Sequence, residues 1–317
     1  MTITIEDTYL NGDNRGHDMS FYKDIPDDIK DRIKQENIMV SIVGASIRPH
    51  FWLSQYENFL QNNITPFEII FCGDSQYDFK LPENFHYIYS KVKPAQCIEI
   101  AARKANGKFL MIFADDILMN RYCIDNLVYT FFKKSTNDYD TVSTVFVNHE
   151  IDVHCIWNQR EKRRNGVLGG IFDVPYCSLG GLCLKKAYME IGGIDKRFIG
   201  TFGDVDINLR MYEKGGKFYI SPYSVIASHG RSRLCSDKSS GINTYAMPLI
   251  RSLWCERYNG GVIDPERYYT KIMNHIYFMG KKPRDNVLFS KKRLSPVEPF
   301  VDENILGNNQ GPAGRWR

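Results

Sequence analysis

The sequence predicts an α/β fold with a mostly parallel central sheet flanked by helices. Apolar runs of strand length alternate with amphipathic helical stretches over the first 116 residues. The clearest run, Phe109–Ala114, is followed at once by two adjacent acids, Asp115 and Asp116. A short continuous apolar run is typical of a strand buried on both faces, as in a parallel sheet. The alternation favours right-handed βαβ units, which bind ligands beyond the carboxyl ends of their strands.

The other expected elements follow from the spacing of apolar residues. Trp52, Tyr56, Phe59 and Leu60 recur at helical spacing, and Gly107 is expected as the left-handed residue that ends a helix. Strands are expected at 38–44, 67–72, 86–90, 141–147 and 218–228, and helices around 26–36, 52–60, 98–105, 124–132 and 205–212.

Composition indicates an ordinary globular protein rather than a membrane-spanning or disordered one. The chain has 317 residues, of which 43% are apolar and 25% charged, and its formal net charge is +4. It contains no uncharged apolar stretch near the roughly 18 residues that cross a bilayer. The first 25 residues lack the apolar core of a signal peptide. We therefore expect a cytoplasmic location.

The eight cysteines predict no disulfide framework and no zinc site. No Cys-x-x-Cys pair occurs, and several cysteines lie in apolar runs. We expect buried free thiols of a reducing compartment. The positions are 72, 97, 123, 155, 177, 183, 235 and 255.

Polar residues follow several of the expected strands. Ser46, Arg48, Asp74 and Asp116 should converge at the carboxyl edge of the sheet. Acids at such an edge suit Mg²⁺ or Mn²⁺, which prefer hard oxygen ligands. The alternative is that the acids only begin a turn or cap a helix. The Gly-x-Gly-x-x-Gly and P-loop signatures are absent from this half, so a nucleotide would bind by other means.

A set of short motifs occurs in a fixed order over roughly residues 38–230. The motifs are Val40–Val43, Glu68–Ile70 with Asp74-Ser75, Gly107–Asp116, Leu179–Lys186, Ile191–Phe198 and Gly203–Arg210, and a histidine, His229, follows them. Together and in this order they resemble the family 2 glycosyltransferases of the GT-A fold.

The resemblance implies transfer of a sugar from a nucleotide-diphosphate donor to an acceptor hydroxyl, with inversion at the anomeric carbon. A UDP-sugar donor, assistance by Mn²⁺ or Mg²⁺, and a role in surface polysaccharide or lipopolysaccharide synthesis are implied with it. The leaving nucleotide develops negative charge that a carboxylate-held metal neutralises. The acceptor hydroxyl is a weak nucleophile, so it needs a general base.

The resemblance also assigns roles to residues. Asp116 matches the metal-binding acid, His229 a histidine near the metal and diphosphate, and Asp204 the catalytic base. Asp74 matches the acid that reads the nucleotide base, and Ala45-Ser46 the pair that touches the nucleotide. The remaining candidates for donor binding come from the residues themselves. Arg48 and Asp115 lie at the ends of expected strands, and at Gly180 and Gly181 the backbone can approach a ligand closely. Arg231 lies in a polar segment that would close over the phosphates.

The sequence departs from the family pattern in three places. Ala114 replaces the first acid of Asp-x-Asp, and Gly203 replaces the Glu of the Glu-Asp pair. In the helix before the acid pair, Cys97-Ile98-Glu99 stands where the family frequently has Ala-Arg-Asn. Asp204 is also well placed to be a simple helix N-cap. Asp206 and Arg210, four residues apart, are expected to form a structural ion pair.

We divide the chain into a polar extension (1–37), the nucleotide-sugar-binding domain (38–232) and a helical region with an extended basic tail (233–317). Two amphipathic helices are expected near 246–258 and 265–279. They would pack on the catalytic domain, form a homodimer or rest on a membrane surface. The tail from 281 holds eight bases against four acids, which suits an anionic membrane or simply a solvated face. Residues 231–240 would be either a lid or a plain linker.

Two other functions stay open at this point. Glycosylation of a nucleic acid or a protein would require the basic cluster 160–164 and the tail to form one positive groove. A non-catalytic GT-A-like binding protein is favoured by Ala114 and Gly203, and opposed by Asp116, Asp204 and His229 together.

Overall fold

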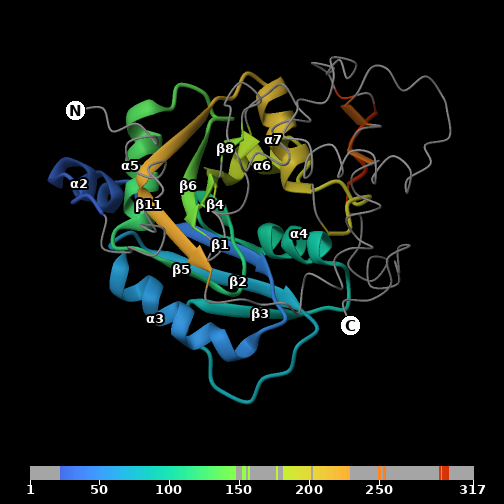
Figure 1. Ribbon diagram of the computed structural model, residues 1–317, viewed down its shortest axis with the longest axis horizontal. Coiled ribbons are helices and arrows are strands. Elements are labelled where there is room, and N and C mark those ends of the chain that lie inside the picture. The colour runs from blue at the N-terminus through green and yellow to red at the C-terminus, as the bar shows by residue number, and fades with distance from the viewer. Residues whose placement is uncertain are drawn as a thin grey trace.

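The computed structural model (Figure 1) describes one continuous part of the chain and several shorter pieces. The described residues are 22–147, 152–154, 156–157, 176–177, 181–200, 203–228, 249–250, 253–254, 293 and 295–299. Most of the expected loop at 148–170, the helix expected at 265–279 and most of both terminal extensions lie outside these residues. The parts of that loop that the structure describes, 152–154 and 156–157, are short strands. In the described part, no helix is long and apolar enough to cross a membrane.

The core of the fold is a nine-stranded sheet in the order β3-β2-β1-β4-β10-β6-β11-β5, with β7 paired to β6. Strands β3, β2, β1 and β4 pair in parallel, as do β6 and β11, whereas β10 is antiparallel to both β4 and β6. Six strands therefore run in one direction, and β5, β7 and β10 oppose them. This confirms the mostly parallel sheet. The bounds are β1 Val40–Ala45, β2 Phe67–Gly73, β3 Phe85–Tyr89, β4 Phe109–Ile112, β5 Ile117–Met119, β6 Thr141–Val147, β7 Asp152–His154, β10 Leu182–Leu184 and β11 Phe218–Ser228.

Helices cover both faces of this sheet (Figure 1). On one face α4, α6 and α7 pack with β1, β2 and β4, and on the other α2, α3 and α5 pack around Trp52 and Phe59. Apolar residues on both faces explain why the central strands are continuous apolar runs. The helices are α2 Asp27–Gln35, α3 Trp52–Asn62, α4 Pro94–Lys104, α5 Cys123–Lys134, α6 Lys185–Glu190 and α7 Gly203–Glu213; a short pair, β8 Ile156–Trp157 and β9 Tyr176–Cys177, lies off the main sheet.

Two expectations at the element level were wrong. Helix α4 ends at Lys104, and Gly107 lies beyond its cap without a positive φ. Glycine at position 107 is required by close packing and not by backbone conformation, because a Cβ there would lie 2.7 Å from the backbone nitrogen of Ser41. In the helix expected at 205–212, helical spacing puts Tyr212 on one apolar face with Val205 and Leu209, but Tyr212 is 41% exposed. Helix α7 is instead buried on most of its circumference, including polar residues that pair internally.

The described cysteines and the start of the C-terminal third agree with the sequence analysis. Cys72, Cys97, Cys123 and Cys183 are buried free thiols. Residues 249–250 and 253–254 are helical, within the helix expected at 246–258. Ile250, Leu253 and Trp254 are buried in the same core cluster as α4 and α7, which favours packing on the domain for this segment.

Candidate functional site

The carboxyl ends of β1 and β4 bring polar residues from distant parts of the chain into direct contact. Asp115, 1% exposed, follows β4 and accepts hydrogen bonds from Ser46 Oγ, Ile47 N and Arg48 N, each at 2.8 Å. These three donors follow β1, which pairs in parallel with β4. The expected convergence of strand-end residues is therefore confirmed for Ser46, Arg48 and the acid pair.

The Arg48 guanidinium bridges both acids. Its Nε lies 2.8 Å from Asp115 Oδ1, its Nη2 also bonds that oxygen, and its Nη1 lies 2.6 Å from Asp116 Oδ2. The Arg48 side chain is only 12% exposed. Burial raises the pKa of Asp116 above its ordinary value, although the charge of Arg48 opposes that rise. The site thus holds a partly desolvated acid beside a fixed cation.

Buried side chains of α3 hold this edge in place. Trp52 is fully buried and donates from Nε1 to Ser46 Oγ at 2.6 Å. Gln55 donates to the carbonyl oxygens of Ala114 and Ile117, both at 2.9 Å, on either side of the acid pair. Because the supporting groups are buried and hydrogen-bonded, the geometry of the acid pair is fixed by the core of the protein.

Asp74 and Ser75 follow β2 at the same edge. The end of β2 lies very close to the residue that follows β1: a Cβ on Gly73 would lie 1.9 Å from the Ser46 carbonyl oxygen. Asp74 Oδ1, Ser75 Oγ and Gln96 Nε2 are buried without a hydrogen-bond partner among the described residues. A buried polar atom left unpaired costs about 1–3 kcal/mol. Polar atoms in this state indicate a place where a ligand or water completes the hydrogen bonding.

Asp204 lies in the first turn of α7, as expected, and the chain path places it at the same edge. The turn before α7 contacts the start of α4, which follows β3, through a hydrogen bond of 3.4 Å from Ala95 N to Ile199 O. The far end of α7 leads to Lys217, whose carbonyl bonds Thr141 N at the start of β6. Helix α7 therefore runs from the carboxyl edge of the parallel strands to the opposite edge.

The Asp204 carboxyl is half-buried, and burial raises its pKa above the ordinary value. Hydrogen bonds from the backbone N–H groups of Val205 and Asp204 at the helix start lower the pKa, but they do not cancel the rise. A carboxylate with a raised pKa is a stronger base than an exposed one. Asp204 lies within the first turn of α7, not at its cap position, and its carboxylate can act as a proton acceptor.

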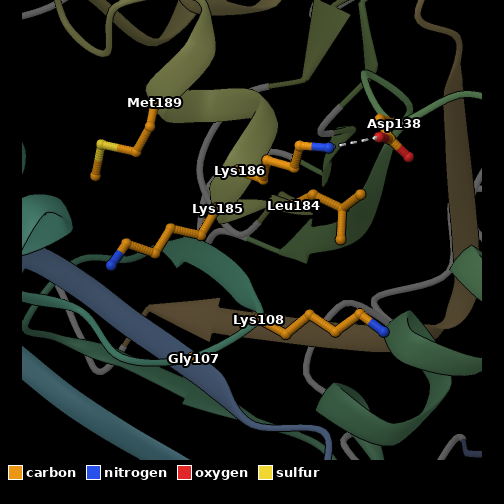
Figure 2. A pocket seen from close by; sticks show the side chains of 7 residues that line it. All are labelled: Gly107, Lys108, Asp138, Leu184, Lys185, Lys186 and Met189. Atoms are coloured by element: carbon orange, nitrogen blue, oxygen red, sulfur yellow. Dashed lines mark ion pairs between the residues drawn. The ribbon is translucent and has the colours of Figure 1, made fainter. Parts of the chain in front are cut away.

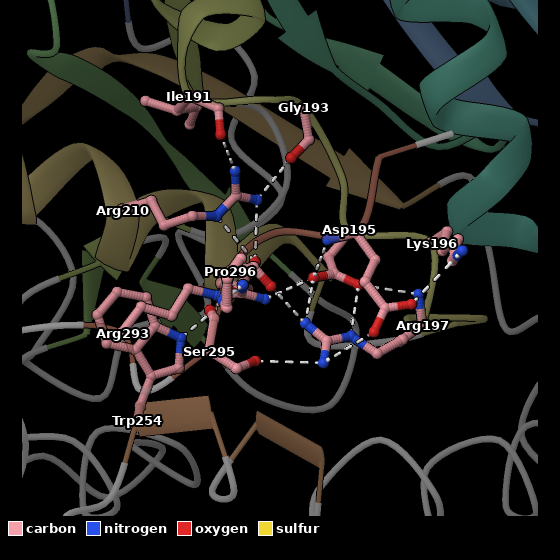
Figure 3. Close-up of polar contacts among 12 residues, drawn as sticks. Ile191, Gly193, Asp195, Lys196, Arg197, Arg210, Trp254, Arg293, Ser295 and Pro296 are labelled. Atoms are coloured by element: carbon pink, nitrogen blue, oxygen red, sulfur yellow. Dashed lines mark hydrogen bonds and ion pairs between the residues drawn. The ribbon is translucent and has the colours of Figure 1, made fainter. Parts of the chain in front are cut away.

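A buried ionic cluster involves Asp206, two residues after Asp204 in α7 (Figure 3). Asp206, fully buried, accepts from Arg210 Nε at 2.9 Å, from Trp254 Nε1 at 2.8 Å and from Arg293 Nε at 3.0 Å. Arg293 also donates to Asp195 Oδ2 at 2.7 Å. The structural role expected for the ion pair Asp206–Arg210 is confirmed.

The same cluster attaches residues 293–298, part of the expected tail, to the domain. Glu298 N donates to Asp195 Oδ2 at 3.0 Å, and Lys196 N donates to the Glu298 carbonyl at 2.9 Å. Sequence reasoning missed Arg293 and Trp254, because nothing local in a basic tail or an amphipathic helix indicates a partner far away in the sequence.

The other predicted site residues fall in two groups. Ala45 ends β1, and Gly181 immediately precedes β10, which is antiparallel to β4, so both lie at the carboxyl edge. His229, Gly180 and Arg231 lie outside the described residues. Their predicted roles stay predictions.

A pocket of about 510 Å³ lies at the opposite edge of the sheet (Figure 2). Its lysines already have partners: Lys108 bonds Glu36 at 2.8 Å, Lys186 lies 3.8 Å from Asp138, and Lys185 donates to a backbone carbonyl. The pocket lies where β4 begins and β10 ends, the acid pair where β4 ends. We therefore place the candidate site at the carboxyl edge and not in this pocket.

Comparison with known proteins identifies the fold. No protein-family model matches the sequence, and no curated protein matches it. Among solved structures, GalNAc-T7 crystallised with UDP, GalNAc and Mn²⁺ superposes with a TM-score of 0.50 at 12% identity, covering 75% of this chain. S. aureus TarS residues 1–349, also solved with UDP, gives a TM-score of 0.49 at 12% identity, over 76% of this chain and 72% of TarS 1–349.

This protein has the fold of GT-A glycosyltransferases: a mixed α/β domain with a mostly parallel central sheet flanked by helices. The chain matches 54% of the length of GalNAc-T7, about half of it. At this identity the likeness concerns the fold, so the activity has to be argued from the site.

Proposed function

We propose that this protein is an inverting glycosyltransferase that moves a sugar from a nucleotide-diphosphate sugar, a UDP-sugar first of all, to an acceptor hydroxyl. We place this activity in the cytoplasm, in the synthesis of a surface polysaccharide or lipopolysaccharide. One observation carries the proposal: at the carboxyl edge of a GT-A sheet, Ser46, Arg48, Asp115 and Asp116 converge, and Asp204 lies at the same edge.

The nucleotide would bind over the ends of β1 and β2. Unpaired buried oxygens of Asp74 and Ser75 offer hydrogen-bonding groups there, and Asp74 matches the acid expected to read the base. Gly181, at the start of β10, would let the backbone approach the donor. A pre-formed polar edge of this kind favours binding because few side chains need to be ordered.

Negative charge develops on the departing nucleotide diphosphate. Arg48, whose guanidinium already lies at this edge, is placed to pair with phosphate oxygens in a bidentate manner. The acid pair also fits a divalent cation, since both carboxylates converge on one positive group. Asp116, with His229 as a second ligand, would hold Mn²⁺ or Mg²⁺, which supplies further neutralisation of that charge when bound. Among the described residues no group of three or more His, Cys, Asp or Glu is placed as a complete metal site.

Asp204 would accept the proton of the acceptor hydroxyl as that oxygen attacks the anomeric carbon. Its raised pKa makes it a better proton acceptor, and its position at the start of α7 fixes the direction of the carboxylate. Attack from the side opposite the leaving nucleotide gives inversion.

The decisive experiment is release of nucleotide from UDP-, GDP- and dTDP-sugars with Mn²⁺, comparing the wild type with Asp204→Asn. We expect Asp204→Asn to lower turnover about 10²- to 10⁴-fold, the usual contribution of a general base. The matched control is Asp138→Asn, an exposed acid at the opposite edge, which should keep full turnover. Equal turnover in both variants would refute the role of Asp204. Nucleotide binding without turnover in the wild type would instead favour a non-catalytic binding protein.

A further inference from the structure

We propose that Arg48 blocks the acid pair against divalent cations until the donor diphosphate draws its guanidinium away, so that metal binding depends on donor binding. The inference rests on the proposed function for the identity of the donor. It concerns a gating role of Arg48 toward the metal rather than a further step of the reaction.

The first argument is geometric. The guanidinium lies on the side of the acid pair where both carboxylates converge, 2.8 Å from Asp115 through Nε and 2.6 Å from Asp116 through Nη1. A cation bound by these oxygens would need the same space. The side chain is 12% exposed, so solvent screens its charge poorly. A free metal ion would therefore have to break charge-assisted hydrogen bonds and approach a buried positive charge.

The second argument concerns what would move Arg48. A nucleotide diphosphate offers the guanidinium a planar, bidentate anionic partner of the kind that it already has in the acids. Once Arg48 pairs with phosphate, the oxygens of Asp116 are available to a metal that the same diphosphate also binds. Donor and metal would then enter together.

The third argument is that Asp115 is held by other groups besides the guanidinium. It accepts hydrogen bonds from Ser46 Oγ, Ile47 N and Arg48 N, none of which involves the Arg48 side chain. Gln55 holds the backbone on both sides of the acid pair independently. A substitution at position 48 should therefore free the acids without dismantling the turn that carries them.

The test measures binding of Mn²⁺ alone by electron paramagnetic resonance, with no donor and no turnover. We expect Arg48→Gln to bind one Mn²⁺ about tenfold or more tightly than the wild type, because the competing charge is removed. Adding UDP should produce comparable Mn²⁺ binding in the wild type. Adding Asp116→Asn to Arg48→Gln should abolish the new binding, which locates it. The control Arg32→Gln removes an equal charge from an exposed arginine paired with Glu36 and should change nothing.

Equal affinity for Mn²⁺ in the wild type and Arg48→Gln would overturn the proposal. Arg48→Lys serves as a second variant with the charge retained: one ammonium cannot bridge both acids as the fork does, so its Mn²⁺ affinity should be intermediate. An affinity equal to that of the wild type would also count against the proposal. The metal-only measurements keep their meaning if no sugar donor is ever turned over, so failure here and failure of the proposed function are distinguishable.

Discussion

Adjacent residues of one type differ at this site because their surroundings differ. Asp115 is enclosed by donors from the residues that follow β1, which hold it as the structural centre of the edge. Asp116 pairs with the Arg48 guanidinium, and burial raises the pKa of its carboxyl. Neighbours, and not residue identity, therefore separate a structural acid from a candidate ligand.

The pH dependence of sugar transfer should reflect Asp204. Because burial raises its pKa, the carboxylate form that accepts a proton is lost at a higher pH than for an ordinary aspartate, about 3.9. Activity should rise with pH through this raised pKa and fall on acidification below it. The measurement is kcat/KM against pH with a saturating acceptor. An unchanged rate down to about pH 4 would contradict the role of Asp204 as base.

At the scale of elements, three segments depend on one ionic cluster. Asp195 in the turn before α7, Asp206 in α7 and Arg293 in the distant 293–298 segment share hydrogen bonds in the interior. Burial alone would raise the pKa of Asp195, but hydrogen bonds from Arg197, Glu298 N and Arg293 hold it well below its ordinary value. Such a cluster fixes relative positions. Losing Arg293 would leave the buried carboxylates of Asp195 and Asp206 with only Arg197 and Arg210, respectively, as charged partners among the described residues.

Arg293→Met should therefore destabilise the protein strongly. It removes one side chain that joins two buried carboxylates, so we expect a loss of about 3–5 kcal/mol in the free energy of unfolding. Urea denaturation followed by circular dichroism measures this. The control is Lys196→Met, whose exposed ion pair with Glu298 should contribute less than about 1 kcal/mol. Similar losses of unfolding free energy in both variants would show that the buried cluster stabilises the protein no more than an exposed ion pair does.

At the scale of the whole molecule, the sheet separates a functional edge from a stabilising core. The polar groups of the candidate site lie at the carboxyl edge, whereas apolar clusters fill both faces. The described thiols belong to those clusters, and burial raises the pKa of Cys183 to about 12. All four are buried, so they are not accessible to reagents in the native state.

Alkylation by iodoacetamide should consequently report on global unfolding at four positions. We expect Cys72, Cys97, Cys123 and Cys183 to stay unmodified in the native protein and to react together across the urea transition. Peptide mass spectrometry resolves each site. Rapid labelling of Cys183 without denaturant would contradict the buried core described for this face.

The amino-acid sequence by itself determined the order and type of the main elements. Local periodicity predicts the apolar runs of β1, β2 and β4 and the helical spacing in α3 and α5. It can be recognised without knowing which elements pack against one another. It also placed Asp115, Asp116 and Asp204 at element ends, where ligands of α/β sheets bind.

Only the tertiary structure decided which of these side chains meet. Arg48 and Asp115 are 67 residues apart, and Arg293 and Asp195 are 98 apart, so no local pattern predicts their contact. Gly107 was misread for the same reason, since the strand that it packs against is distant in sequence. Periodicity fixes elements because it acts between neighbours, whereas charge pairing across the sheet depends on how the whole chain packs.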